Sequence, residues 1–280
     1  GATTRGWLRG LAKHRPRAEV WLDVLKPGGA AALLHDEHPR LVVVDTAHRL
    51  GLEADQGTPE SVAAHVDQVL AEPWRAPRWL AGLDALRSAD VVHVLGGGFV
   101  NAHGNHTASI LATMHWLGVN TDARLAVSGA GLTPAFTGLS QRYAELGPRL
   151  EVATVRDPES VAVLPGSVLG ADDVWLGGVD QHVDQRTSGP DVMVLAQGDG
   201  HERADELAAT VGDLMESWGV TGGAYGVVEA NPPVDGYVRA ALEERFGDHQ
   251  FHSFGDVMAH GLPARPGQRW ISTRYHPHLL

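Results

Sequence analysis

The chain has 280 residues, which is enough for one large domain or two domains of ordinary size. Hydrophobic residues make up 43% of it and charged residues 20%, a composition typical of globular proteins. The formal net charge of −12 disfavours DNA or RNA as a partner, because a polyphosphate needs a basic surface. Cysteine is absent, which excludes disulfides, zinc–thiolate sites and a cysteine nucleophile.

No apolar run approaches the roughly 18 residues that a membrane-spanning helix needs, and no signal-peptide pattern opens the sequence. We therefore expect a cytoplasmic protein without a transmembrane segment, in keeping with the lack of cysteine.

Strand-like and helix-like patterns alternate along the whole chain. The first part predicts strands at 18–25, 40–46, 90–95, 123–129, 150–155 and 174–178, and helices at 3–14, 59–71, 78–88, 105–118, 137–146 and from Pro158. The second part predicts strands at 191–197, 224–230, 249–254 and 268–273, and helices at 202–218 and 234–245. We also expect a strand before the first helix and a helix that begins at Pro277.

A polar segment separates the two series. Residues 179–190 end in Ser-Gly-Pro and are the best candidate for a linker. Two series of alternating strands and helices predict two Rossmann-like, doubly wound parallel sheets, in domains of residues 1–180 and 190–280. A single large sheet is the alternative.

Two arginines follow predicted strands, at the edge where ligands bind in parallel sheets. Arg156 precedes an Asp-Pro pair that suits the start of a helix, and Arg274 precedes Tyr275, His276 and a further proline. An arginine fork beside a helix N-terminus matches a phosphate or carboxylate, and a nearby histidine can move protons. The structural alternative is that Arg156 forms only a loop ion pair with Asp157.

Two glycine-rich loops also follow predicted strands. Gly96, Gly97 and Gly98 come after the apolar run at 90–95, with Asn101 in the polar loop behind them. Gly129 ends the strand predicted at 123–129, and Gly131 follows it. Glycines allow a ligand to approach the backbone closely, although tight strand-to-helix turns would explain them equally well.

Ser128 lacks the Gly-x-Ser-x-Gly spacing of a nucleophile. The 16 histidines show no metal-binding spacing, so we predict no metal site.

Five segments, in this order, resemble the polysaccharide pyruvyltransferase family: VVHVLGGGFVN, LAVSGAGLTP, VATVRDPESVAVL, GADDVW and WISTRYHP. The opening GATTRGWLRGL is similar to that family's first loop and helix, so the resemblance covers nearly the whole chain. Its specific elements are the triple glycine, the Arg-Asp-x-x-Ser segment from Arg156 to Ser160, and the segment from Thr273 to His276.

The resemblance implies a GT-B-like fold, in which two Rossmann-like domains face a cleft. It implies transfer of a pyruvyl group from phosphoenolpyruvate to a sugar hydroxyl or diol of a cell-surface polysaccharide or lipid-linked glycan precursor. No cofactor is implied beyond the donor substrate, and the implied location is the cytoplasm, at the inner face of the membrane.

By the same resemblance, Arg156 and Arg274 would bind the phosphate and carboxylate of the donor, and His276 would be the general acid or base. The implied substrate-binding residues are Gly96, Gly97, Gly98, Asn101, Gly129, Gly131, Ser160 and Thr273. The sequence departs from the family at Tyr275, where Leu or Phe is more usual, and after Leu280, where the family continues with a helix and a strand.

Two other functions fit the same pattern. One is a GT-B glycosyltransferase that uses a nucleotide sugar, and the other is a non-catalytic module that binds glycans or anions. Stabilisation by UDP would favour the first, and a glycan shift without phosphate release would favour the second.

Overall fold

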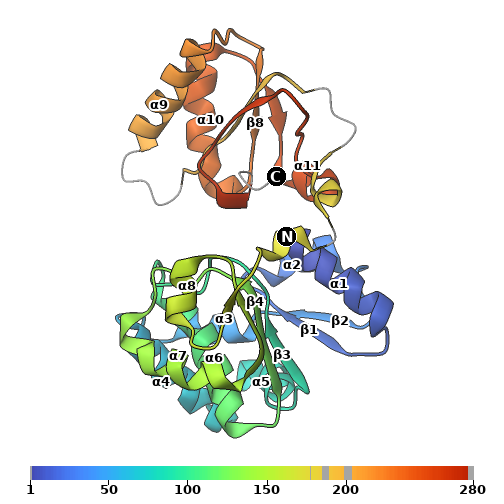
Figure 1. The fold of residues 1–280 in the computed structure, drawn as a ribbon, viewed down its shortest axis with the longest axis vertical. Coiled ribbons are helices and arrows are strands. Elements are labelled where there is room, and N and C mark those ends of the chain that lie inside the picture. Colours follow the sequence, from blue (N-terminus) through green and yellow to red (C-terminus); the bar gives the residue numbers. More distant parts are fainter. Residues whose placement is uncertain (1, 177, 185–188, 199–203, 277–280) are drawn as a thin grey trace. The chain divides into compact units, whose positions relative to one another are not determined.

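The computed structural model describes residues 2–176, 178–184, 189–198 and 204–276. It is a mixed α/β structure with parallel sheets (Figure 1). The chain divides into two compact units, one of residues 3–176 and one of the described residues from Gly178 onward. Each unit has its own sheet and its own apolar core.

The first unit contains two parallel sheets. Strands β1 (Val20–Asp23) and β2 (Leu41–Val44) form a two-stranded sheet. Four strands form the second sheet in the order β3 (Val91–Val94), β4 (Arg124–Ala130), β5 (Leu150–Val155) and β6 (Val168–Leu169). The helices are α1 (Ala2–His14), α2 (Pro27–Leu34), α3 (Thr46–Glu53), α4 (Pro59–Ala71), α5 (Leu80–Arg87), α6 (Ala108–Asn120), α7 (Ser140–Leu146) and α8 (Pro158–Val163).

The core of this unit lies between the four-stranded sheet and the helices α4, α6 and α7, which lie on one side of β3 and β4 (Figure 1). Leu117 of α6 and Val155 of β5 are fully buried in it. Burial of such side chains contributes about 1.5–3 kcal/mol each, which outweighs the weak intrinsic helix preference of short segments. Thr58, the residue before Pro59, and Ser61 in the first turn form a capping box. This explains why α4 begins where the sequence predicts.

The second unit contains one parallel sheet in the order β10-β7-β8-β9. Its strands are β7 (Val192–Leu195), β8 (Tyr225–Val228), β9 (Gln250–His252) and β10 (Arg269–Ser272), and its helices are α9 (Ala204–Ser217), α10 (Pro232–Phe246) and α11 (Phe254–His260). The two central strands, β7 and β8, are buried at every position, as expected of parallel strands covered on both faces.

The predicted strand at 174–178 is wrong. Asp173–Trp175 form a 3-10 helix, because the carboxylate of Asp172 accepts a hydrogen bond from the backbone N–H of Val174 and starts the turn. The strand beside β5 is β6 instead. Three short helices were not predicted, namely α2, α3 and α11.

The segment predicted as a linker is partly structured. Val179–His182 form a 3-10 helix, and Val183 makes a parallel bridge with Leu262. Residues 185–188 of that segment, and the helix predicted from Pro277, lie outside the described residues. None of the helices in the described ranges is long and apolar enough to cross a membrane.

Candidate functional site

The loops that follow β3, β4 and β5 are joined to one another by backbone hydrogen bonds. The N–H of Gly131 donates to the carbonyl of Gly97 at 2.9 Å, and the N–H of Arg156 donates to the carbonyl of Ala130 at 3.0 Å. The structure therefore brings the two predicted glycine loops and the predicted arginine together at the carboxyl edge of one sheet. This is the edge at which open parallel sheets bind ligands.

Arg156 is packed between the two glycine loops. A Cβ atom at Gly98 would lie 2.6 Å from its Nη2 atom, and a Cβ at Gly131 would lie 2.7 Å from its Nε atom. Its Nη1 atom donates to Oδ2 of Asp172 at 2.7 Å, and the two side chains are only 12% and 3% exposed. A side chain at either glycine would displace the guanidinium from the orientation in which a buried carboxylate holds it.

The side chain of Asp173 joins the same loops by hydrogen bonds. Its Oδ2 atom accepts hydrogen bonds from the hydroxyl of Ser128 at 2.6 Å and from the N–H of Gly96 at 3.0 Å. Gly129 has a φ of +53°, and a Cβ there would lie 2.7 Å from the backbone nitrogen of Asp173. A residue other than glycine at position 129 would be strained and would push against this carboxylate.

His93 of β3 extends this buried network. Its Nε2 atom lies 2.7 Å from the Oγ atom of Ser128. The single hydroxyl proton of Ser128 points at Asp173, so the geometry assigns a proton to His93 Nε2 and makes Oγ the acceptor. Because His93 donates to Oγ and does not accept its proton, Ser128 is not arranged as a nucleophile activated by a histidine. Burial lowers the pKa of His93, and the charge of Asp173 opposes that shift.

The lowered pKa of His93 predicts a pH dependence of stability. Below a pH of about 6.5 the unfolded chain binds a proton at this histidine while the folded chain resists it, so stability falls as the pH falls. One proton limits the slope to about 1.4 kcal/mol per pH unit. Urea unfolding between pH 8 and pH 5.5 should show a smaller loss of stability for His93→Gln than for the parent. Equal losses would contradict a neutral, half-buried His93.

The side chains of Asn101 and Ser160 form hydrogen bonds to backbone groups within the loops. The Asn101 amide donates to the carbonyl of Gly98 at 2.7 Å, and its oxygen accepts from the N–H of His103. The hydroxyl of Ser160 accepts from the N–H of Leu132 at 2.8 Å. Both side chains are buried, so in this structure they shape the loops around Arg156.

Arg274 is held in a similar way in the second unit. Its Nη2 atom donates to Oδ1 of Asp235 at 2.7 Å, and the Asp235 side chain is only 4% exposed. The other oxygen of Asp235 accepts from the N–H groups of Ala230 and Asn231, at the turn that leads into α10. In both units, an arginine at a strand end is therefore fixed by a buried aspartate.

The other predicted residues of this unit follow β10 directly. The hydroxyl of Thr273 accepts from the backbone N–H of Gln197 at 2.7 Å, which joins the loops after β10 and β7. His276 is exposed, and its ring meets the ring of Tyr275 edge-on, with centroids 5.6 Å apart. An exposed imidazole two residues from Arg274 can exchange protons with a bound ligand or with solvent.

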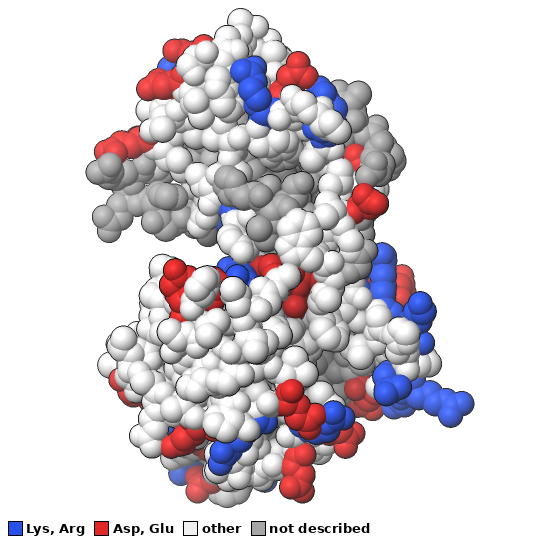
Figure 2. Space-filling model, in the orientation of Figure 1, with Lys and Arg blue, Asp and Glu red and all other residues white. Residues whose placement is uncertain are grey.

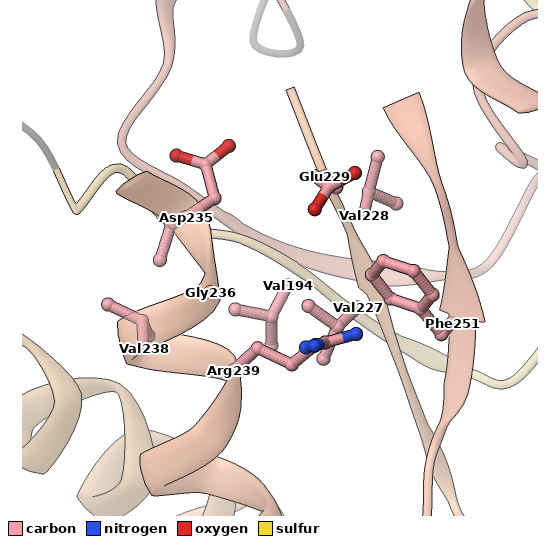
Figure 3. A pocket seen from close by; sticks show the side chains of 10 residues that line it. Val194, Val227, Val228, Glu229, Asp235, Gly236, Val238, Arg239 and Phe251 are labelled. Atoms are coloured by element: carbon pink, nitrogen blue, oxygen red, sulfur yellow. The ribbon is translucent and has the colours of Figure 1, made fainter. Parts of the chain in front are cut away.

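A small pocket adjoins Asp235, between α10 and the sheet (Figure 3). The guanidinium of Arg239 extends from α10 over the ring of Phe251, 4.4 Å from its centroid. Within the described ranges, no carboxylate forms an ion pair with Arg239, and Glu229 accepts from the N–H of Phe254 instead. The pocket is lined by Val194, Ala196, Val227, Val228, Glu229, Asp235, Gly236, Val238, Arg239 and Phe251.

Sequence reasoning missed the acidic members of the site. Asp172 and Asp173 stand in the GADDVW segment, and two adjacent acidic residues directly before the predicted strand at 174–178 were the available signal. Asp235 lies in a Pro-Pro-x-Asp stretch with no such signal. In the part of the chain that the structure describes, no three histidine, aspartate or glutamate side chains are placed to hold a metal ion.

Charged side chains of both signs are interspersed on the face shown in Figure 2. Arg156 in the first unit and Arg274 in the second are mostly buried beside aspartates. Because the overall charge is negative, an anionic ligand at either strand edge would depend on local donors.

The fold and the two arginines define a class: an α/β protein with parallel sheets, in which each unit carries an arginine paired with a buried aspartate at a carboxyl edge. No family model and no curated protein matches this chain. The function must therefore be argued from the site itself and from the motifs in the sequence.

Proposed function

We propose that this protein is a pyruvyltransferase, which moves a pyruvyl group from phosphoenolpyruvate to a sugar hydroxyl or diol and releases phosphate. The observation that carries the proposal is Arg156, which is held by buried Asp172 inside the glycine loops at the carboxyl edge of a parallel sheet. The order of the motifs in the sequence supports the same reaction.

The charges of the donor match the two arginines. Phosphoenolpyruvate carries a phosphate and a carboxylate, and each can accept paired hydrogen bonds from a guanidinium. The proposal includes the GT-B-like arrangement that the resemblance implies, in which Arg156 and Arg274 face one cleft. Because each arginine is already fixed by an aspartate, little side-chain freedom is lost when the donor binds.

The proposed chemistry needs one acid and one base. A proton is added to the methylene carbon of phosphoenolpyruvate, which leaves C2 electron-poor. The oxygen of a sugar hydroxyl forms a bond to C2 and gives up its proton. The second hydroxyl of a diol then forms a bond to C2, the bond between C2 and the phosphate oxygen breaks, and the proton of that hydroxyl leaves with the phosphate. His276 is the proposed proton carrier, and the arginines stabilise the charge that develops on the phosphate.

The acceptor in this proposal is a cell-surface polysaccharide unit or its lipid-linked precursor. The protein acts on it in the cytoplasm, at the inner face of the membrane. No metal or cofactor is part of the proposal. The histidine chemistry is of a kind that contributes about 10²–10⁴ in rate.

The test is phosphate release from phosphoenolpyruvate with a panel of free and lipid-linked hexose acceptors. We expect release with at least one acceptor, and a loss of about 10²–10⁴ in turnover for His276→Ala with donor binding retained. His260→Ala removes an exposed histidine at the end of α11 and should leave turnover unchanged.

Thermal-shift measurements with phosphoenolpyruvate and with UDP separate the rival functions. Stabilisation by UDP alone would replace the proposal with a nucleotide-sugar glycosyltransferase. Turnover unchanged in His276→Ala would remove this histidine from the mechanism.

A further inference from the structure

The pocket between α10 and the sheet of the second unit contains two side chains of opposite charge. Glu229 and Arg239 both line it, and Figure 3 shows the carboxylate and the guanidinium apart from each other. Among the described residues, neither forms an ion pair with the other or with a third group. Opposite charges attract strongly where water is partly excluded, so other contacts must hold these two apart.

Phe251 holds the guanidinium of Arg239. The guanidinium lies over the Phe251 ring, 4.4 Å from its centroid, which gives it one fixed plane. Its Nε atom is buried and has no hydrogen-bond partner among the described residues. A buried N–H without an acceptor is costly, and its presence in a native protein indicates a water or a ligand at that point.

A second arginine of α10 shows that stacking alone does not leave a guanidinium unpaired. Arg245 also lies over an aromatic ring, 5.6 Å from the centroid of Phe246. Its guanidinium nevertheless donates to Asp213 at 2.7 Å and to Glu216 at 2.9 Å. Arg239 therefore differs from its neighbour on the same helix in facing a pocket with its donors unused.

A backbone group holds Glu229 in its place. One carboxylate oxygen accepts from the N–H of Phe254 at 3.1 Å, and the other has no hydrogen-bond partner among the described residues. Phe251 pairs in register with Val227, and Glu229 follows Val227 by two residues, so its side chain lies on the same face of the sheet. At about 3.3 Å per residue, about 7 Å along the strand separates Glu229 from the ring that Arg239 covers.

These charges determine which kind of ligand suits the pocket. Glu229 and Asp235 both line it and would repel an anion, and Arg239 would repel a cation. A neutral ligand with hydroxyl groups suits both signs, because a hydroxyl can donate to a carboxylate and accept from a guanidinium. Two hydrogen bonds of about 2.8 Å, made by two adjacent hydroxyls, span the distance between the two charged groups.

We propose that this pocket binds two adjacent hydroxyl groups of a sugar, of which one donates to Glu229 and the other accepts from Arg239. The space in the pocket, its open side included, is about 270 Å³, so it receives one edge of a sugar ring. Asp235 lines the pocket and also holds Arg274, so the sugar lies beside that arginine. The inference rests on the proposed function only in naming this sugar as the acceptor.

The experiment titrates a panel of free hexoses into the protein without phosphoenolpyruvate and measures binding by saturation-transfer NMR. Glu229→Gln keeps an acceptor for the N–H of Phe254, and Arg239→Met keeps an apolar side chain over Phe251. We expect each variant to bind the best hexose at least about tenfold more weakly than the parent. Arg245→Met is the matched control and should leave hexose affinity unchanged, and melting curves of all four proteins report folding.

Three results would overturn the inference: hexose affinity equal in the parent and both folded pocket variants, no binding of any hexose, or binding of inorganic phosphate that Arg239→Met abolishes. The second would mean that the pocket holds only water, and the third that it is an anion site. The outcome is separate from that of the proposed reaction. A parent that binds hexoses through Glu229 and Arg239 but releases no phosphate from phosphoenolpyruvate would confirm this site and remove the reaction.

Discussion

Arg156→Ala is expected to weaken phosphoenolpyruvate binding by about 100-fold or more. The guanidinium lies between Gly98 and Gly131. The variant would lose two charge-assisted hydrogen bonds to the phosphate of the donor, which together contribute about 3 kcal/mol or more to binding. Calorimetric titration of the donor into parent and variant measures the change. Arg124→Ala is the matched control, because Arg124 is an exposed arginine on β4 that pairs with Glu151 across the same sheet. Its loss should leave donor affinity unchanged.

Loss of Arg156 also leaves Asp172 buried without its partner, which costs about 3–5 kcal/mol in typical cases. Each titration therefore needs a melting curve of the same sample. Arg156→Lys keeps a positive charge beside Asp172 but loses the planar fork, so it should stay folded and still bind the donor more weakly than the parent. Undiminished affinity in a folded Arg156→Lys and in a folded Arg156→Ala would remove Arg156 from the donor site.

Asp173→Ala is expected to be strongly destabilising. The carboxylate is 5% exposed and accepts hydrogen bonds from Ser128 and from the N–H of Gly96. Its removal leaves two buried donors unsatisfied, at about 1–3 kcal/mol each, so Tm should fall by about 5–15 °C. Differential scanning calorimetry of the purified variant measures this.

Asp173→Asn tests the cause of that loss. The amide oxygen can still accept from Ser128, so the variant should recover part of the stability. Asp84→Ala removes an exposed aspartate on α5 and should change stability by less than about 0.5 kcal/mol. A Tm for Asp173→Ala as high as that for Asp84→Ala would mean that the loops do not depend on the carboxylate.

Long periodic segments could be predicted from the sequence, and short ones could not. Helix α4 begins and ends at the predicted residues because a capping box and a proline mark its start, and strand β5 matches its prediction as well. Helices α2, α3 and α11 have only seven or eight residues, too few to show a period of 3.6 clearly. The apolar run at 174–178 looked like a strand, but its start is governed by the side chain of Asp172.

The arginines of the site were visible in the sequence because their neighbours mark strand ends. The buried aspartates were not, since Asp172 and Asp235 gain their role only from contacts 16 and 39 residues away along the chain. The hydrophobic periodicity of a sequence does not indicate which distant residues will form an ion pair. The histidine of the buried network, His93, also looked like an ordinary strand residue, and only its distance to Ser128 sets it apart.

The pairing of each arginine with a buried aspartate has a consequence for selectivity. A lone guanidinium in a cleft would attract chloride, sulfate and inorganic phosphate, which are abundant in any cell, by charge alone. Here the neighbouring carboxylates of Asp172 and Asp235 cancel most of that attraction and repel a poorly placed anion. If the proposed function holds, selectivity among anions at these strand edges depends on the placement of the ligand's oxygens as well as on its charge.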